Sequence, residues 1–376
     1  MAHSFLFLSL AREARDLDNL LSRRQGANVR NTILNIREDD YVRLFRLTRK
    51  LVDDVDEDLE GKLKTTKTLN TKTKILCTLS FLASGSYQRI ISANIFTFVS
   101  QPTMSRSIHD VVDALSHPDI VRKYLRFPQT SQERQLLKER FYQKFKINGC
   151  IGCVDGTFIA MIRPTEDEER YYCRKGYHAR NVQLIVDADL NILHVDASYG
   201  GSFHDSFIFN NSVIKEHLEE VNNSNETAYL LGDSAYCQRA YMMVPVPNVL
   251  NGSPEAMYNK VHATARNSVE RVIGILKGRF RCLLVHRVLH YDPITVGKIV
   301  IACCVLHNIC NRAGLVAPEL STEDHTMENR LQAQYYLRDG NSSELELGRL
   351  ARAQLIRTIW HNSRPIYSSM RRVVSP

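Results

Sequence analysis

Runs of apolar residues follow one another between residues 148 and 312 with the lengths expected of strands and helices. Three runs rich in β-branched residues predict strands, over Cys150–Ile162, Asn181–Val186 and Asn191–Ala197. Residues Asp187–Leu190 form the predicted hairpin turn between the second and third strands. The pattern therefore starts with strands that follow each other closely enough to pair in antiparallel directions.

Helix-spaced patterns and one more strand complete this region. The segment GSFHDS opens a helix that continues to Leu218, and Ala228–Leu231 is a short buried strand that ends abruptly at Gly232. A long helix is predicted over Glu255–Phe280. The order strand, strand, strand, helix, strand, helix predicts an α/β fold with a ribonuclease-H-like core.

Helical patterns flank this core on both sides. We expect a helical N-terminal region over 1–70, a helical domain over 71–147, the α/β domain over 148–312 and a C-terminal helical tail over 313–376. In the tail an acidic stretch precedes a helix over Ser343–Trp360. We interpret the tail as peripheral packing or a surface for a partner.

Part of the 71–147 region resembles a helix-turn-helix. Helical patches at 74–83 and 88–98 precede a helix with Ser100 as N-cap and Pro102 in its first turn. A groove of DNA would meet the polar residues that lead this helix, which are Gln101, Thr103, Ser105 and Arg106. The glycine often found in the turn is missing, so an all-α helix-turn-helix-like region and a plain helical bundle both remain open.

The charge balance favours a polyanionic partner. The formal net charge is +8 and the pI is about 9.0, which points to nucleic acid first and an anionic membrane surface second. An ordinary basic protein without such a partner fits the charge equally well. Nine cysteines without a framework spacing suit reduced thiols of an intracellular protein. No apolar run approaches the length of a transmembrane helix, so we expect no membrane partner.

Two carboxylates lie on strands that can be neighbours in the sheet. Asp155 lies in the first strand, and Asp233 follows the fourth strand directly. A residue at the carboxyl end of such a strand points into the crevice where α/β sheets carry out chemistry, although a lone Asp often only caps a turn. A third acid can come from the long helix, where Glu270 is the single acid between Lys260 and His290.

Glu270 has two interpretations. It can pair with Arg266, four residues earlier, as an ordinary ion pair on a helix surface. It can also join the two aspartates, with cations beside it for phosphate groups: Arg266, Lys277 and Arg279. Three gathered carboxylates suit hard divalent ions such as Mg²⁺ or Mn²⁺, and two such ions can activate a water and stabilise the leaving oxygen of a phosphodiester.

Five segments agree in order and spacing with one known family. They are GCVDGTFIAMIRP, GSFHDS, LLGDSAY, NSVERVIGILKGRFRCL and ACCVLHNIC. Together they resemble the PIF/Harbinger transposases, and most of all the Harbinger transposase-derived nucleases, over roughly residues 70–310. Two features depart from the family pattern: Phe158 stands where a His often follows the DGT segment, and the helix-turn-helix glycine is absent.

This resemblance implies a divalent-metal-dependent endonuclease of the DDE type that acts on DNA. The three acids of the family fall on Asp155, Asp233 and Glu270, and its His-Asp motif falls on His204 and Asp205, which implies that Asp205 supports the metal site. The resemblance also implies a nuclear role, with the cytoplasm not excluded, and a separate Myb-like DNA-binding partner. The oligomeric state stays open, a homo-oligomer included.

Weaker metal candidates and a second function class complete the sequence picture. Cys150 and Cys153 have a zinc-like spacing but lack a second ligand pair, and a core helix accounts better for the group Cys303, Cys304, His307 and Cys310. The alternative to an active nuclease is a domesticated protein of the same origin that binds DNA or a partner without cutting.

Overall fold

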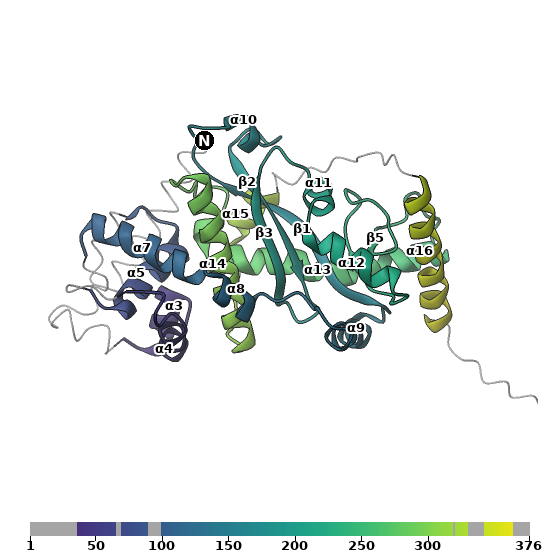
Figure 1. The fold of residues 1–376 in the computed structure, drawn as a ribbon, viewed down its shortest axis with the longest axis horizontal. Coiled ribbons are helices and arrows are strands. Elements are labelled where there is room, and N and C mark those ends of the chain that lie inside the picture. The colour runs from purple at the N-terminus through teal and green to yellow at the C-terminus, as the bar shows by residue number, and fades with distance from the viewer. Residues whose placement is uncertain (1–35, 65–68, 89–98, 319, 330–341, 364–376) are drawn as a thin grey trace, which may run out of the picture.

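A five-stranded mixed sheet forms the middle of the molecule in the computed structural model (Figure 1). The structure describes residues 36–64, 69–88, 99–318, 320–329 and 342–363. The strand order is β3-β2-β1-β4-β5. This order agrees with the ribonuclease-H-like arrangement predicted from the sequence, and it makes the first and fourth strands neighbours.

At one side of the sheet, each of three strands runs antiparallel to its neighbour. β1 (Cys150–Ala160) pairs with β2 (Ala179–Val186), and β2 pairs with β3 (Ile192–Gly200). The predicted turn between β2 and β3 is built on Asp187, whose Oδ1 accepts hydrogen bonds from the backbone N–H groups of Asp189 and Asn191. Every residue of β2 is buried, so this strand lies in the interior of the sheet with both faces covered.

The other two strands are short and parallel to β1. β4 (Tyr229–Leu231) pairs with β1, and β5 (Met242–Met243) pairs with β4. In the β1–β4 register Cys153 lies opposite Leu231. The residues two positions further along each strand, Asp155 and Asp233, are therefore expected at the same level of the sheet, on the same face.

Helices cover both faces of the sheet. The long helix α13 (Pro254–Arg279) and α14 (Pro293–Arg312) pack on one face, where they share a hydrophobic cluster with the buried side chains of β1 and β2. A second cluster on the other face joins β1 and β4 to α12 (Val213–Asn223) and α11 (Asp205–Asn210). The sequence predicted a single helix through Leu218, but Ser212 caps the start of a second helix by accepting a hydrogen bond from Lys215 N–H.

Helix α14 is long and apolar enough to cross a membrane, by its length and composition alone. The sequence pattern had predicted no segment of that kind. It is 20 residues long and apolar, and among the described residues it is the one such helix. Within its most apolar stretch 78% of the residues are buried inside the protein. The apolar composition of α14 is therefore explained by its place in the core.

The N-terminal helices lie together at one end of the molecule (Figure 1). They are α3 (Glu38–Phe45), α4 (Arg49–Asp58), α5 (Thr71–Ser84) and α7 (Gln101–Leu115), followed by α8 (Pro118–Tyr124) and α9 (Ser131–Phe145). Their buried side chains belong to the same hydrophobic cluster as β1, β2 and α14, so one core continues from these helices into the sheet. The division into domains at residue 147 stays a prediction.

The helix-turn-helix prediction is not confirmed by this end of the molecule. Ser100 caps α7 as expected, because its side chain accepts a hydrogen bond from Thr103 N–H. Gln101 and Arg106 are exposed, while Thr103 and Ser105 are half-buried. Nearly all of the predicted middle patch at 88–98 lies outside the described residues. The role of α7 in reading DNA therefore stays a prediction.

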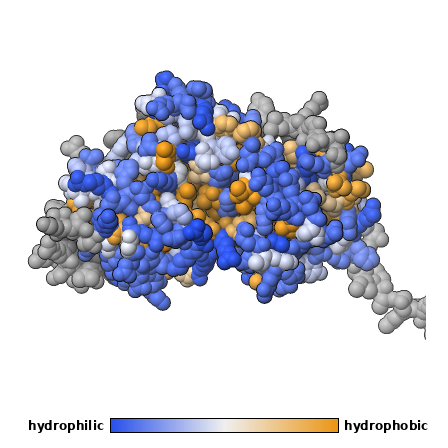
Figure 2. Space-filling view, in the orientation of Figure 1, coloured by the Kyte–Doolittle hydropathy of each residue, from blue (hydrophilic) through white to orange (hydrophobic). Residues whose placement is uncertain are grey.

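Short elements and the C-terminal helix complete the fold. They are α10 (Glu168–Tyr171), the 3-10 turn η1 (Arg281–Leu283), α15 (Thr322–Asn329) and α16 (Ser342–Ser363). Helix α16 matches the predicted C-terminal helix and docks beside β5, where Arg352 donates to the carbonyl of Val244. Figure 2 shows a largely hydrophilic surface, with hydrophobic residues gathered over the middle of the molecule.

Candidate active site

Asp155 and Asp233 meet at the edge of the parallel pair β1–β4. One guanidinium nitrogen of Arg266 lies 2.7 Å from Asp155 Oδ2 and 3.9 Å from Asp233 Oδ2. Two atoms within 4 Å of the same nitrogen lie within 8 Å of each other, so the two carboxylates lie close together, as expected for residues on neighbouring strands. Asp233 is fixed further by a hydrogen bond of 2.9 Å from Ala235 N–H to its Oδ1.

Asp205 joins the two aspartates from the first turn of α11. Asn181 on β2 donates a hydrogen bond of 2.7 Å to Asp205 Oδ1, and Gln183 donates one of 3.0 Å to the Asp205 carbonyl. Gly156, next to Asp155, makes this approach possible, because a Cβ at that position would overlap the Asp205 carboxylate. The absence of a side chain at Gly156 therefore lets two acidic groups approach across β1.

We call Asp155, Asp205, Asp233 and Glu270 the acid cluster. Arg266 on α13 is the cation at its centre. Its side chain is 12% exposed and pairs with Asp155, Asp233 and Glu270. Burial by itself lowers the pKa of Arg266, but the negative charges of these acids outweigh it and hold the pKa above its usual value. The guanidinium therefore remains charged.

Glu270 lies on the outer side of Arg266. Its side chain is 54% exposed, compared with 16% for Asp155 and 14% for Asp233. The ion pair with Arg266 predicted by the first interpretation of the sequence is present. Asp155 and Asp233 are therefore the inner acids of the cluster, and Glu270 stands at its rim.

Crowding of negative charge perturbs two of the acids. Burial raises the pKa of Asp155 to about 7, the charges of Asp233 and Asp205 add to this rise, and Arg266 opposes it. Burial also raises the pKa of Asp205, although the hydrogen bond from Asn181 opposes the rise. Arg266 pairs with three of the four carboxyl groups and the charge of Arg174 acts on the fourth, Asp205, so the acids outnumber the arginines.

The inner acids line a hollow of about 100 Å³ that also has basic walls. Among its lining residues are Arg174, Lys175 and Lys277. Burial, with Lys277 adding to it, lowers the pKa of Lys175 to about 8. Most Lys175 side chains are still protonated at pH 7. The hollow thus combines a carboxylate wall, suited to cations, with a basic wall suited to phosphate oxygens.

The donor set fits a divalent metal ion in its chemistry. Asp155, Asp205 and Asp233 offer the hard oxygen atoms that Mg²⁺ and Mn²⁺ prefer. Asn181 Oδ1, in the wall of the same hollow, is buried without a hydrogen-bond partner and could serve as a further oxygen ligand. Across the described residues no three acidic, His or Cys side chains are grouped closely enough to hold a metal already. In this arrangement Arg266 supplies the positive charge.

The basic residues predicted to contact phosphates divide into two groups. Arg266 belongs to the acid cluster. The prediction is wrong for Arg279, which is 2% exposed and donates a hydrogen bond to the Leu315 carbonyl in the core. Lys277 is also buried, and its Nζ pairs with Glu328 at 2.5 Å and donates to the Phe158 carbonyl. Both side chains are buried in the fold, although the sequence pattern predicted that they are available to phosphate groups.

The cysteine candidates behave as core residues. Cys150 and Cys153 are buried in β1, and the Cys153 thiol donates to the Ala265 carbonyl. Cys303, Cys304 and Cys310 are buried in α14. His204, from the His-Asp motif, is exposed and stands just before α11 without a side-chain capping bond.

Sequence reasoning missed the two polar side chains that hold Asp205. Asn181 and Gln183 lie on β2, whose other residues are mostly apolar, and both are almost fully buried. A polar residue inside a buried strand has to find hydrogen-bond partners, so its occurrence there was a usable signal. The alternation of Asn181 and Gln183 places both on the same face of the sheet, the face on which α11 lies.

Comparison with known proteins gives a consistent result for this region. Residues 154–308 match the DDE superfamily endonuclease family, and this span contains the whole acid cluster. "Putative nuclease HARBI1" of Bos taurus is 31% identical over 70% of this chain and 74% of its own length. The Xenopus laevis protein of that name is 30% identical over 78% of this chain and 84% of its own length.

A plant relative is less similar to this chain than the nuclease-named proteins are, and the solved structures include no match. "Protein ALP1-like" of Arabidopsis thaliana is 24% identical over 71% of this chain and 65% of its own length. No solved structure matches the chain. The family match and the identity to the nuclease-named relatives place the acid cluster within a nuclease domain, and the chain therefore belongs to the Harbinger transposase-derived nucleases of the DDE endonuclease superfamily.

Proposed function

We propose that this protein is a divalent-metal-dependent endonuclease that hydrolyses phosphodiester bonds of DNA. The observation that carries the proposal is the convergence of Asp155, Asp205 and Asp233 on one hollow, from β1, α11 and the end of β4. These acids come from three separated parts of the chain, and burial, with the charges of Asp233 and Asp205 adding to it, raises the pKa of Asp155 to about 7. A fold that only needed stability would gain little from such crowding.

Each group in the hollow has a role in this proposal. Asp155 and Asp233, with Asp205 beside them, would hold the metal ions, and the bound metal would activate water and stabilise the leaving oxygen. Asn181 orients Asp205 through its amide N–H and presents its unpaired oxygen to the hollow. Lys175 on the opposite wall is placed to pair with a phosphate oxygen of the DNA strand.

A nicking assay tests the proposal. Supercoiled DNA is incubated with the full chain and Mg²⁺ or Mn²⁺, beside Asp233→Asn, which keeps the size of the side chain and removes its charge. We expect nicking by the unchanged chain to fall by about a thousandfold or more in the variant and to stop in EDTA. Equal nicking by the two proteins would remove the active-site assignment.

One observation favours the second candidate, a derived protein that binds DNA or a partner without cutting. Arg266 lies between Asp155, Asp233 and Glu270, in the space where a cation would neutralise them. If Arg266 is a permanent substitute for the metal, divalent ions will not raise the melting temperature of the protein and no nicking will be seen. A nuclear location, a homo-oligomer and a Myb-like partner remain predictions from the family resemblance.

A further inference from the structure

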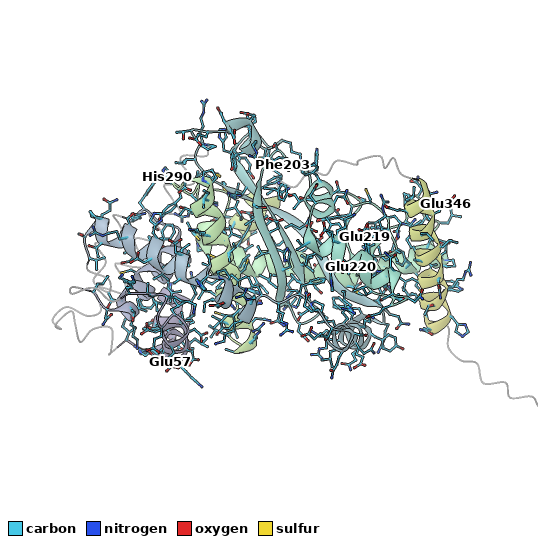
Figure 3. All side chains as sticks on the ribbon, viewed as in Figure 1. Glu57, Phe203, Glu219, Glu220, His290 and Glu346 are labelled. Carbon is cyan, nitrogen blue, oxygen red and sulfur yellow. The ribbon has the colours of Figure 1, made fainter. Side chains whose placement is uncertain are left out.

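Three aromatic rings form a cluster beside the acid cluster. The rings of Phe203 and Phe207 are stacked, with centroids 5.2 Å apart and planes at 27°. Tyr199, at the end of β3, meets both rings edge-on, at 5.4 Å and 6.1 Å. Phe207 is 47% exposed, so its ring forms part of the surface. Figure 3 labels Phe203, close to α10 and α11, and in Figure 2 hydrophobic residues reach the surface near the position of α11.

The aromatic cluster and the active site are built on the same segment. Asp205, which lines the hollow, stands between Phe203 and Phe207 in the sequence. Asn181 donates one hydrogen bond to the Phe203 carbonyl, at 2.9 Å, and another to the Asp205 carboxylate. One buried side chain therefore fixes both the acid and the backbone that carries the aromatic rings.

A cation borders the rings and fixes the loop before α11. The guanidinium carbon of Arg170 lies 5.8 Å from the Phe203 ring centroid. The carbonyl of Arg170 accepts hydrogen bonds from the Ser202 backbone and hydroxyl, at 3.1 Å and 2.8 Å. Arg170 is itself about half-exposed and also pairs with Asp167 at 3.3 Å, so its positive charge beside the rings is shared with a neighbouring acid.

A single exposed aromatic residue is ordinary on a protein surface. Stacked rings that are partly exposed, bordered by a cation and joined to an acidic active site form a more specific combination. Aromatic faces with nearby positive charge are how proteins hold the bases of unpaired DNA, because every base has a π-face and every nucleotide a phosphate. Enzymes that act on a base of a duplex likewise take it out of the stack and hold it against aromatic or apolar side chains.

We propose that Tyr199, Phe203 and Phe207 form a stacking platform for an unpaired nucleobase of the DNA strand held in the hollow. This inference rests on the proposed function, since it assumes DNA as the substrate. Phe207, the exposed ring, makes the contact with the base. Phe203 supports it by stacking against its ring, and Tyr199 supports it by an edge-on contact. The platform gives the protein a preference for DNA with an unpaired base next to the bond in the active site.

An affinity measurement tests the platform without any cleavage. The full chain in EDTA is titrated with a fully paired duplex and with the same duplex carrying one bulged 2-aminopurine, whose fluorescence is quenched when it stacks. We expect the bulged duplex to bind about tenfold more tightly and its fluorescence to fall. Phe207→Leu, at an exposed position, should lose both effects and keep the affinity for the paired duplex. Phe207→Trp should keep both effects.

Tyr142→Leu is the matched control, because Tyr142 on α9 is exposed to a similar extent, 41%, and lies outside the lining of the hollow. It should leave the preference for the bulge intact. Equal affinity of the unchanged chain for both duplexes, or a preference that survives in Phe207→Leu, overturns the platform. Nicking with Mg²⁺ and no preference for the bulge defeats the platform alone. A preference without any nicking defeats the nuclease proposal alone.

Discussion

Helix α13 carries a cluster of charges at each of two places, and the two clusters are built on opposite principles. Near its middle, Arg266 pairs with three carboxyl groups, from β1, the end of β4 and its own helix, and Asp205 of α11 lines the same hollow. Near its C-terminal end two cations are each paired with an acid from α15. Lys277 pairs with Glu328 at 2.5 Å, and Arg281, just beyond the helix, pairs with Asp324 at 3.0 Å.

The difference separates a site from a structural contact. In the α15 contact the charges balance, and Glu328 also accepts a hydrogen bond from Val285 N–H, so its polar atoms are satisfied inside the fold. In the acid cluster the carboxyl groups outnumber the arginines, and the unpartnered Asn181 Oδ1 is an oxygen that lines the hollow, whereas the unpartnered atom of Arg281 at the α15 contact is a nitrogen. A buried excess of negative charge costs stability, and proteins keep such an excess where a cation is to be bound.

The largest effect on stability is expected from the balanced contact. Lys277→Met removes a buried cation and leaves Glu328 without its main partner, which should cost about 3 kcal/mol of the free energy of unfolding. Urea unfolding measures this loss. Glu328→Gln, which can still accept the hydrogen bond from Val285, should cost less.

The same variant distinguishes the two clusters by function. Lys277 and Glu328 also line the hollow, but Glu328 already neutralises Lys277, so Lys277→Met should leave the divalent-ion dependence of nicking unchanged per folded molecule. A selective loss of DNA affinity in a fully folded Lys277→Met protein would show that Lys277 contacts phosphates after all, and that the contrast between the two clusters is wrong.

An intermediate effect is expected from pH, through Asp155. Its pKa is raised to about 7, against about 3.9 in an unfolded chain. The folded state therefore binds the Asp155 proton more tightly than the unfolded state does. The stability contributed by this protonated acid is fully present below about pH 4 and is lost as the pH rises from there through about 7.

A comparison of variants isolates this effect from other titrations. Relative to the unchanged metal-free protein, Asp155→Asn should become steadily more stable between pH 5 and 8 in urea unfolding. Glu226 is the matched control from a balanced site, because hydrogen bonding to Arg134 lowers its pKa to about 2. Glu226→Gln should lose stability relative to the unchanged protein at neutral pH, and this difference should shrink only at acidic pH. A flat difference for Asp155→Asn would mean that Arg266 fully neutralises the cluster.

The sequence predicted the positions of the two aspartates in the sheet better than it predicted which charged side chains are buried around them. Strand patterns and the order of strands and helices were enough to place Asp155 and Asp233 side by side, because that order predicted the first and fourth strands as neighbours. The burial of Lys277 and Arg279 could not be predicted in this way. It depends on Glu328 of α15 and on the Leu315 carbonyl, which the chain brings to Lys277 and Arg279 from 51 and 36 residues away. A basic helix face has the same pattern whether solvent, DNA or an acidic segment covers it.

Glu270 offers the smallest effect on stability and the sharpest test of where the acid cluster ends. The Glu270 side chain is 54% exposed and pairs with Arg266, one turn earlier on the same helix. Glu270→Gln keeps the size of the side chain and removes its charge, so the loss in stability should be at most about 0.5 kcal/mol, as for an ordinary surface pair. The packing face of α13 is untouched, so DNA affinity should survive.

The nicking rate then decides between the two interpretations of Glu270. If it is the third metal-holding acid, as the family resemblance implies, nicking should fall by orders of magnitude while stability hardly changes. Asp205→Asn is the matched comparison, because Asp205 lies deeper in the hollow and is held by Asn181. A nicking rate in Glu270→Gln like that of the unchanged protein, with a large loss in Asp205→Asn, would make Asp205 the third acid and Glu270 a surface partner of Arg266. Losses in both variants would extend the functional cluster from the buried hollow to its exposed rim.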